Sequence, residues 1–133
     1  GTLTASNSVT NAGTFTNDNT GILTAINTVT NAGTFTNGGD FNTIDLENTE
    51  TSAFDNTGTL TASNTVTNSG TFTNDGSFTA VETNNTATLE NTGTLNVTTI
   101  NNEGNTLGDG TYNILGDFTS SGTFFSAAGA VYM

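Results

Sequence analysis

The residues of this chain that could do chemistry are its acids, its hydroxyls and its aromatic rings. The 133 residues include 12 Asp and Glu but no Cys, His, Lys or Arg, so the formal net charge is −12. Zinc, haem and iron–sulfur centres therefore lack their usual ligands, and Ser-His-Asp and Cys-His nucleophile pairs are impossible. Phosphate binding depends on cationic side chains, so we expect no nucleic-acid partner.

The acids suggest two kinds of site. Asp45, Glu47 and Glu50 form one local group and Asp109 with Asp117 another, and calcium prefers such oxygen ligands. The chain has no EF-hand loop and no glycine-rich Asp nonapeptide, so solvated charge is the favoured interpretation and we expect no cofactor. Paired carboxylates can also hydrolyse glycosides, but cationic or aromatic groups for a sugar are not evident. We therefore predict that the protein is not an enzyme.

Six aromatic residues could form either a stacking surface for a ligand or the core of the fold. They are Phe15, Phe35, Phe72, Phe78, Phe118 and Phe124. All six belong to a series of large apolar residues that recurs about every six positions, which predicts that they are core. The series runs Leu3, Val9, Phe15, Leu23, Val29, Phe35, Phe41, Leu46, Phe54, Leu60, Val66, Phe72, Phe78, a weak member near Val81, Leu89, Leu95, Ile100, Leu107, Tyr112, Phe118 and Phe124.

The elements that position these residues are repeated. Residues 1–18 read GTLTASNSVTNAGTFTND and residues 58–75 read GTLTASNTVTNSGTFTND, which differ at two of the eighteen positions. Taken in threes, the apolar series gives seven turns of 17 to 20 residues. An Asn-x-Gly motif separates many of the apolar residues. We expect it to form corners, with Gly supplying positive φ and Asn bonding the local backbone.

These features predict an all-β fold, a single-domain three-sided parallel β-solenoid of about seven coils. Short strands such as Gly-Thr-Phe-Thr place the apolar residue inward and Thr outward, with Thr and Asn ladders along the outside and the corners. A right-handed coil is favoured. An antiparallel sandwich would need longer strands, and a left-handed hexapeptide helix would need strict spacing of six. Asp18 and Asp75 hold the same motif place in non-adjacent coils, which indicates that like charges avoid stacking.

The Asn-x-Gly-Thr-Leu/Phe pattern on a coil near 19 residues resembles the β-helix of filamentous-haemagglutinin-type adhesins and autotransporter passenger domains. The resemblance covers nearly the whole chain, although the Pro of the two-partner secretion signature is missing. It implies a secreted protein of the bacterial surface or matrix, and it carries over no binding residue. No run of residues is long enough to span a bilayer, so we expect no membrane insertion.

The two ends suggest how the protein functions. Residues 1–126 are predicted to form the solenoid and residues 127–133 an apolar segment that pairs with the next subunit. Strand edges without caps invite stacking, so the leading hypothesis is a homopolymer, a secreted filament subunit of a biofilm matrix or surface appendage. The predicted interface consists of Thr2, Leu3, Val9, Val131, Tyr132 and Met133. The alternatives are a rod segment of a large adhesin and a functional amyloid.

Overall fold

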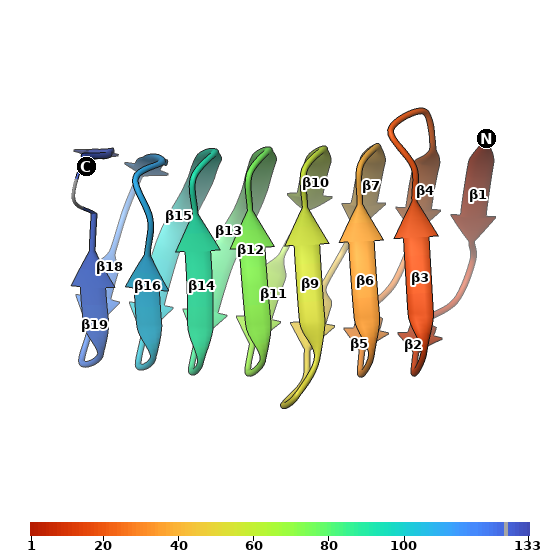
Figure 1. Cartoon of the computed structure of the whole chain (residues 1–133), viewed down its shortest axis with the longest axis horizontal. Coiled ribbons are helices and arrows are strands. Elements are labelled where there is room, and N and C mark those ends of the chain that lie inside the picture. The colour runs from red at the N-terminus through yellow and green to blue at the C-terminus, as the bar shows by residue number, and fades with distance from the viewer. Residues whose placement is uncertain (127) are drawn as a thin grey trace.

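The computed structural model describes residues 1–126 and 128–133 and consists of strands stacked into a rod (Figure 1). The first side contains β1 (Thr2–Ala5), β4 (Ile22–Ala25), β7 (Asp40–Thr43), β10 (Thr59–Ala62), β13 (Ser77–Asn85), β15 (Thr94–Asn102), β17 (Thr111–Ile114) and β20 (Ala130–Tyr132). The second side contains β2 (Val9–Asn11), β5 (Val29–Asn31), β8 (Leu46–Asn48), β11 (Thr65–Asn68), the later parts of β13 and β15, and β18 (Phe118–Ser120). The third side contains β3 (Thr14–Asn17), β6 (Thr34–Asn37), β9 (Ala53–Asn56), β12 (Thr71–Asn74), β14 (Thr88–Asn91), β16 (Asn105–Leu107) and β19 (Thr123–Phe125).

The predicted three-sided parallel β-solenoid is confirmed. Every strand pair among the described residues is parallel, which excludes the antiparallel sandwich. The first two sides form one sheet because β13 and β15 run through the corner between them, and the third side forms a second sheet. Paired residues are 20 positions apart for Thr2 and Ile22 but 17 apart for Thr71 and Thr88. None of the described residues belongs to a helix long and apolar enough to cross a membrane.

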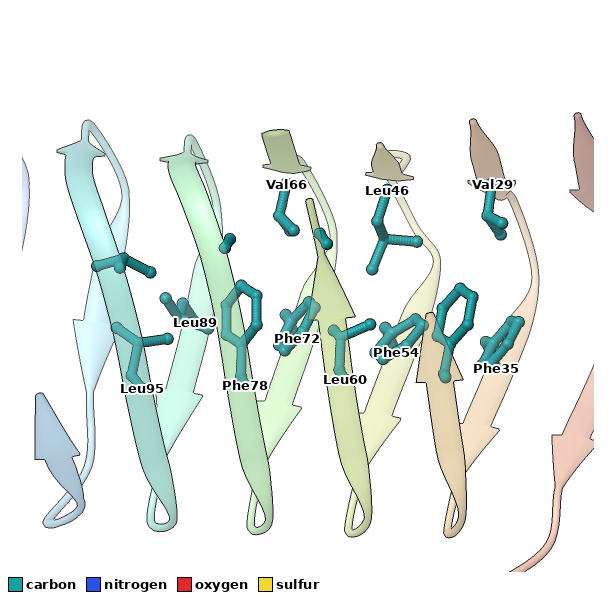
Figure 2. Packing of buried hydrophobic residues seen from close by; sticks show 14 of the residues in the cluster. Val29, Phe35, Leu46, Phe54, Leu60, Val66, Phe72, Phe78, Leu89 and Leu95 are labelled. Carbon is teal, nitrogen blue, oxygen red and sulfur yellow. The ribbon is translucent and has the colours of Figure 1, made fainter. Parts of the chain in front are cut away.

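The core consists of one axial column of large apolar residues from each side (Figure 2), and the first side adds a column of smaller ones that includes Ala25, Ala80 and Val97. Phe35, Phe72 and Phe78 are fully buried, as their place in the apolar series predicted. The third-side column stacks aromatic rings, with centroids 4.8 Å apart for Phe35 and Phe54 and 4.9 Å apart for Phe54 and Phe72. Phe15, Phe118 and Phe124 are half-buried and pack against the same core, because they lie in the first and last coils.

The register corrects two members of the predicted apolar series. Val81 is 48% exposed, and Thr83 instead lies in the second-side column between Val66 and Ile100. Leu107 does not lie in the third-side column either, because Thr106 pairs with Leu89 and takes the inward position. In both places period-2 alternation along the strand selects a Thr for the inward face, even though an apolar neighbour stands beside it.

The corner glycines are required for a reason other than the positive φ that was expected of them. Among the described residues only Gly108, at φ 110°, and Thr51, at φ 66°, have positive φ. A Cβ built on Gly76 would instead lie 2.1 Å from the carbonyl oxygen of Gly58 in the preceding coil, and one on Gly93 would lie 2.1 Å from the oxygen of Gly76. Glycine is therefore required at these corners because successive backbones approach too closely for any side chain.

Candidate assembly surfaces

Two ladders of buried Asn side chains run along the rod. They are Asn11, Asn31, Asn48, Asn68, Asn85 and Asn102 in one ladder, and Asn17, Asn37, Asn56, Asn74 and Asn91 in the other. Asn ladders were predicted along the outside and the corners; the ladders are present at the corners, but an outward position is wrong, because all eleven Asn are buried, at 8% exposure or less. Phe15 and Asn17 are two residues apart, so period 2 places both on the inner face, a signal that was available in the sequence.

Each ladder has a direction. The Nδ2 of one Asn donates to the Oδ1 of the Asn in the next coil, over 2.8 Å from Asn11 to Asn31 and 2.7 Å from Asn17 to Asn37. The same Nδ2 also donates to a backbone carbonyl of the next coil, as Asn11 does to Thr34 at 2.8 Å. The amide nitrogens thus face the C-terminal end and the amide oxygens face the N-terminal end, which gives the rod a chemical polarity.

The ladders end differently at the two ends of the rod. At the N-terminal end Asn17 donates through Nδ2, but within the described chain its Oδ1 accepts no hydrogen bond. At the C-terminal end the first ladder finishes on Ser120, whose Oγ accepts from Asn102 at 3.1 Å and donates to Gly122 O at 3.2 Å. Ser126 occupies the same position in the second ladder's column, one residue beyond the Leu107–Phe125 pair.

The predicted interface residues lie at opposite ends of the rod (Figure 1). Thr2 and Leu3 are on β1 and Val9 is on β2, with Leu3 52% exposed and Val9 half-buried. At the other end β20 does not extend freely but pairs in parallel with β17 of the same chain, placing Val131 on Tyr112. Residue 127, the predicted domain boundary, lies outside the described residues.

The fold therefore shows which strands have an edge that could pair with another molecule. Among the strands that the structure describes, β1, β2 and β3 at the N-terminal end each pair along one edge only. At the C-terminal end the same is true of β18, β19 and β20. Tyr132, the last residue of β20, and the adjacent Met133 were also predicted to be interface residues, and both are exposed.

The acids are distributed around the rod and do not converge on a site. No three acids among the described residues are close enough together to hold a metal ion, including the groups around Asp45 and Asp109. The backbone N–H of Thr65 and the Nδ2 of Asn64 instead donate to Asp45 Oδ1, at 3.1 and 2.8 Å. In the paired strands, carboxylates lie opposite neutral residues, as Glu82 does with Thr65.

Three ionisable groups have shifted pKa values. The backbone N–H and the hydroxyl of Thr20 donate to Asp18 and hold the pKa of that carboxyl below its ordinary value. Partial burial, followed by repulsion from Asp75, raises the pKa of Asp55. Burial raises the pKa of Tyr112 to about 12, and its hydroxyl donates to Leu107 O at 2.6 Å. Asp18, Asp55 and Tyr112 lie in different coils, so their shifted pKa values do not define a general acid–base pair.

Comparisons of the chain with protein-family models, with curated proteins and with solved structures return no match. The geometry defines a β-solenoid whose chemistry lies in its axial columns. Those columns finish at the two end faces of the rod, where core residues such as Phe15 and Phe124 are only half-buried.

Proposed function

We propose that this chain is a structural subunit of a secreted extracellular filament whose copies assemble head to tail by stacking solenoid ends. The observation that carries the proposal is the register of the columns. Phe15 lies on Phe35, Phe35 on Phe54 and Phe54 on Phe72, so each coil meets a near-copy of itself. A contact that repeats within the chain can repeat between chains, and a heterologous contact of this kind does not close on itself.

Charge sets the conditions under which such stacking is favourable. The side chains carry 12 negative charges and no positive ones, so bringing two copies together costs electrostatic free energy. Salt and millimolar calcium screen this repulsion, and mild acid removes it by protonating carboxylates. We therefore expect assembly to be promoted by all three.

Negative-stain microscopy and light scattering test the proposal. The purified chain should form long unbranched fibres, and scattering should increase with salt, calcium or acid. Val9→Asp should prevent assembly because it puts a charge on the inner face of the first coil. Thr10→Asp adds the same charge to the outer face of β2 and should leave assembly intact. Absence of fibres under every condition, or equal loss in both variants, would refute the proposal.

A second candidate is the rod segment of a large secreted adhesin. The open edges of β1 and β19 favour it, because further coils of a longer chain would pair with them just as a second copy would. On this alternative the protein remains as separate short rods, roughly 33 Å long at about 4.8 Å per coil. The secreted location in both candidates is supported by the resemblance of the repeat to adhesin and passenger-domain repeats.

A further inference from the structure

The C-terminal cover, residues 128–133, lies over part of the last complete coil. Its strand β20 pairs with β17 through three residues, Ala130, Val131 and Tyr132. The backbone N–H of Ala128 also donates to Asp109 Oδ1 at 3.2 Å. Val131 is 41% exposed and Tyr132 is 61% exposed, so the cover buries little of its own surface.

The cover also prevents a second copy from stacking in register on the C-terminal end of the rod. The edge of β17 is occupied by β20, whereas the edges of β18 and β19 remain open. A second copy placed over this end would meet β20 on the first side, about one strand spacing of 4.8 Å before it reached the other two sides. Its first coil could therefore not pair on all three sides at once while the cover is in place.

Without the cover, the two ends of the chain match on every side. Continuing the register that joins consecutive coils would put Leu3 of a second copy on Tyr112, Val9 on Phe118 and Phe15 on Phe124. Val9, Phe15, Phe118 and Phe124 are four of the five core residues that are left half-buried among the described residues, and Ala5 on β1 is the fifth. The contact would complete their burial, and it would bring the rings of Phe124 and Phe15 together across the junction.

Two polar side chains of one axial column, one at each end of the rod, also match in this register. The Oγ of Ser126 is buried and has no hydrogen-bond partner in the described chain. Asn17 lies at the N-terminal end, where its Nδ2 donates to Asn37 at 2.7 Å and its Oδ1 accepts no hydrogen bond from the described residues. Both residues belong to the same axial column, so the Ser126 hydroxyl of one copy would donate to Asn17 Oδ1 of the next. A Cβ on Gly129 would lie 2.4 Å from Ser126 Oγ, so the cover lies directly over this donor.

We infer that residues 128–133 are a removable cover and that a second copy of this chain displaces them, pairing β1, β2 and β3 with β17, β18 and β19. This inference rests on the proposed head-to-tail filament and specifies its junction. In the junction Asp117, one residue before the Ile100–Phe118 pair, would face Ser8, so the register brings no carboxylate onto it. The cover then limits assembly, the reverse of the joining role that its apolar sequence predicted.

Cross-linking in the Cys-free chain tests the junction directly. Thr14 and Thr123 are exposed and lie in the same outward column of the third side, so Thr14→Cys with Thr123→Cys places thiols on facing strands. Paired strands lie about 4.8 Å apart, which a disulfide can bridge. Within one chain the two positions are six coils apart, roughly 29 Å, so only copies can be linked. Thr14→Cys with Thr119→Cys is the control, because Thr119 lies on the second side.

The experiment compares the full chain with a chain ending at residue 127 and with Val131→Asn, which weakens the cover without shortening it. The expected result is a ladder of disulfide-linked multimers from the Thr14/Thr123 pair and not from the control. Both weakened forms should give it after a shorter lag and at a lower protein concentration, with circular dichroism unchanged. If fibres form but the truncated chain assembles more slowly, or the two pairs cross-link equally, the inference is wrong and the filament stands. If no form makes fibres or multimers, the proposed filament is wrong as well.

Discussion

Two inward-facing Thr residues provide a matched test of how the core treats polar groups. Thr83 and Thr106 are both at most 1% exposed, and each replaces an apolar residue in its column. The hydroxyl of Thr106 donates to Asn102 Oδ1 at 2.9 Å and accepts from Asn85 Nδ2 at 3.3 Å. The hydroxyl of Thr83 has no partner in the described chain. The same substitution, Thr→Val, should therefore have opposite effects at the two positions.

The magnitudes follow from the hydrogen bonds. Thr83→Val removes a buried group that lost its water without gaining a partner, so it should raise the free energy of unfolding by about 1–3 kcal/mol. Thr106→Val removes a satisfied hydroxyl while Asn85 keeps its bond to Asn102 at 2.8 Å, so it should lower that free energy by about 0.5–1.5 kcal/mol. The two variants should differ by roughly 1.5–4.5 kcal/mol.

Thermal melting followed by circular dichroism measures this difference. A change of 1 kcal/mol moves the midpoint of a chain of this size by about 2–8 °C, so the two shifts should be resolved and opposite in sign. Thr79→Val, an outward residue on β13, is the control and should change the midpoint little. If Thr83→Val lowers the midpoint as much as Thr106→Val does, the Thr83 hydroxyl is satisfied and the reasoning is refuted.

Three further predictions concern the core, the corners and the charges. Phe72→Ala should lower the free energy of unfolding by about 3–5 kcal/mol because it opens a cavity in the aromatic column. Thr71→Asp, on the outer face of the same strand, should lower that free energy by less, as measured by urea denaturation. The reverse order would show that the inner and outer faces are assigned the wrong way round. Gly76→Ala should lower the melting midpoint sharply, since its Cβ would lie 2.1 Å from a carbonyl oxygen of the preceding coil; a neutral effect would show that the corner relaxes freely. Asp55 binds a proton more readily in the folded chain because its pKa is raised, so its destabilising charge is lost as pH falls through that pKa. Asp55→Asn should thus raise the melting midpoint at pH 7 by more than Asp75→Asn does and lose its advantage in acid; a gain independent of pH would contradict this cause.

The sequence by itself determined the architecture. A single large apolar residue every six positions, repeated in near-identical blocks such as 1–18 and 58–75, allows parallel coils to bury their faces only against one another. The same spacing located Phe35, Phe72 and Phe78 in the core, because a period of two fixes which face of a strand is inward. Local pattern was sufficient wherever the answer depended on the strand's own alternation.

Only the tertiary structure decided what each coil meets in its neighbours. The glycines are required by carbonyl oxygens 17 to 20 residues away, a distance in sequence that no local turn rule includes. The Asn residues are buried because each finds an amide in the next coil, which supplies the hydrogen bonds that burial requires. Likewise, the sequence predicted that the C-terminal segment pairs with another copy. In the folded chain β20 pairs with β17 instead, because the edge of β17 in the same chain is nearer than any partner. Pairing across coils fixes these features, and that pairing exists only once the chain has wound.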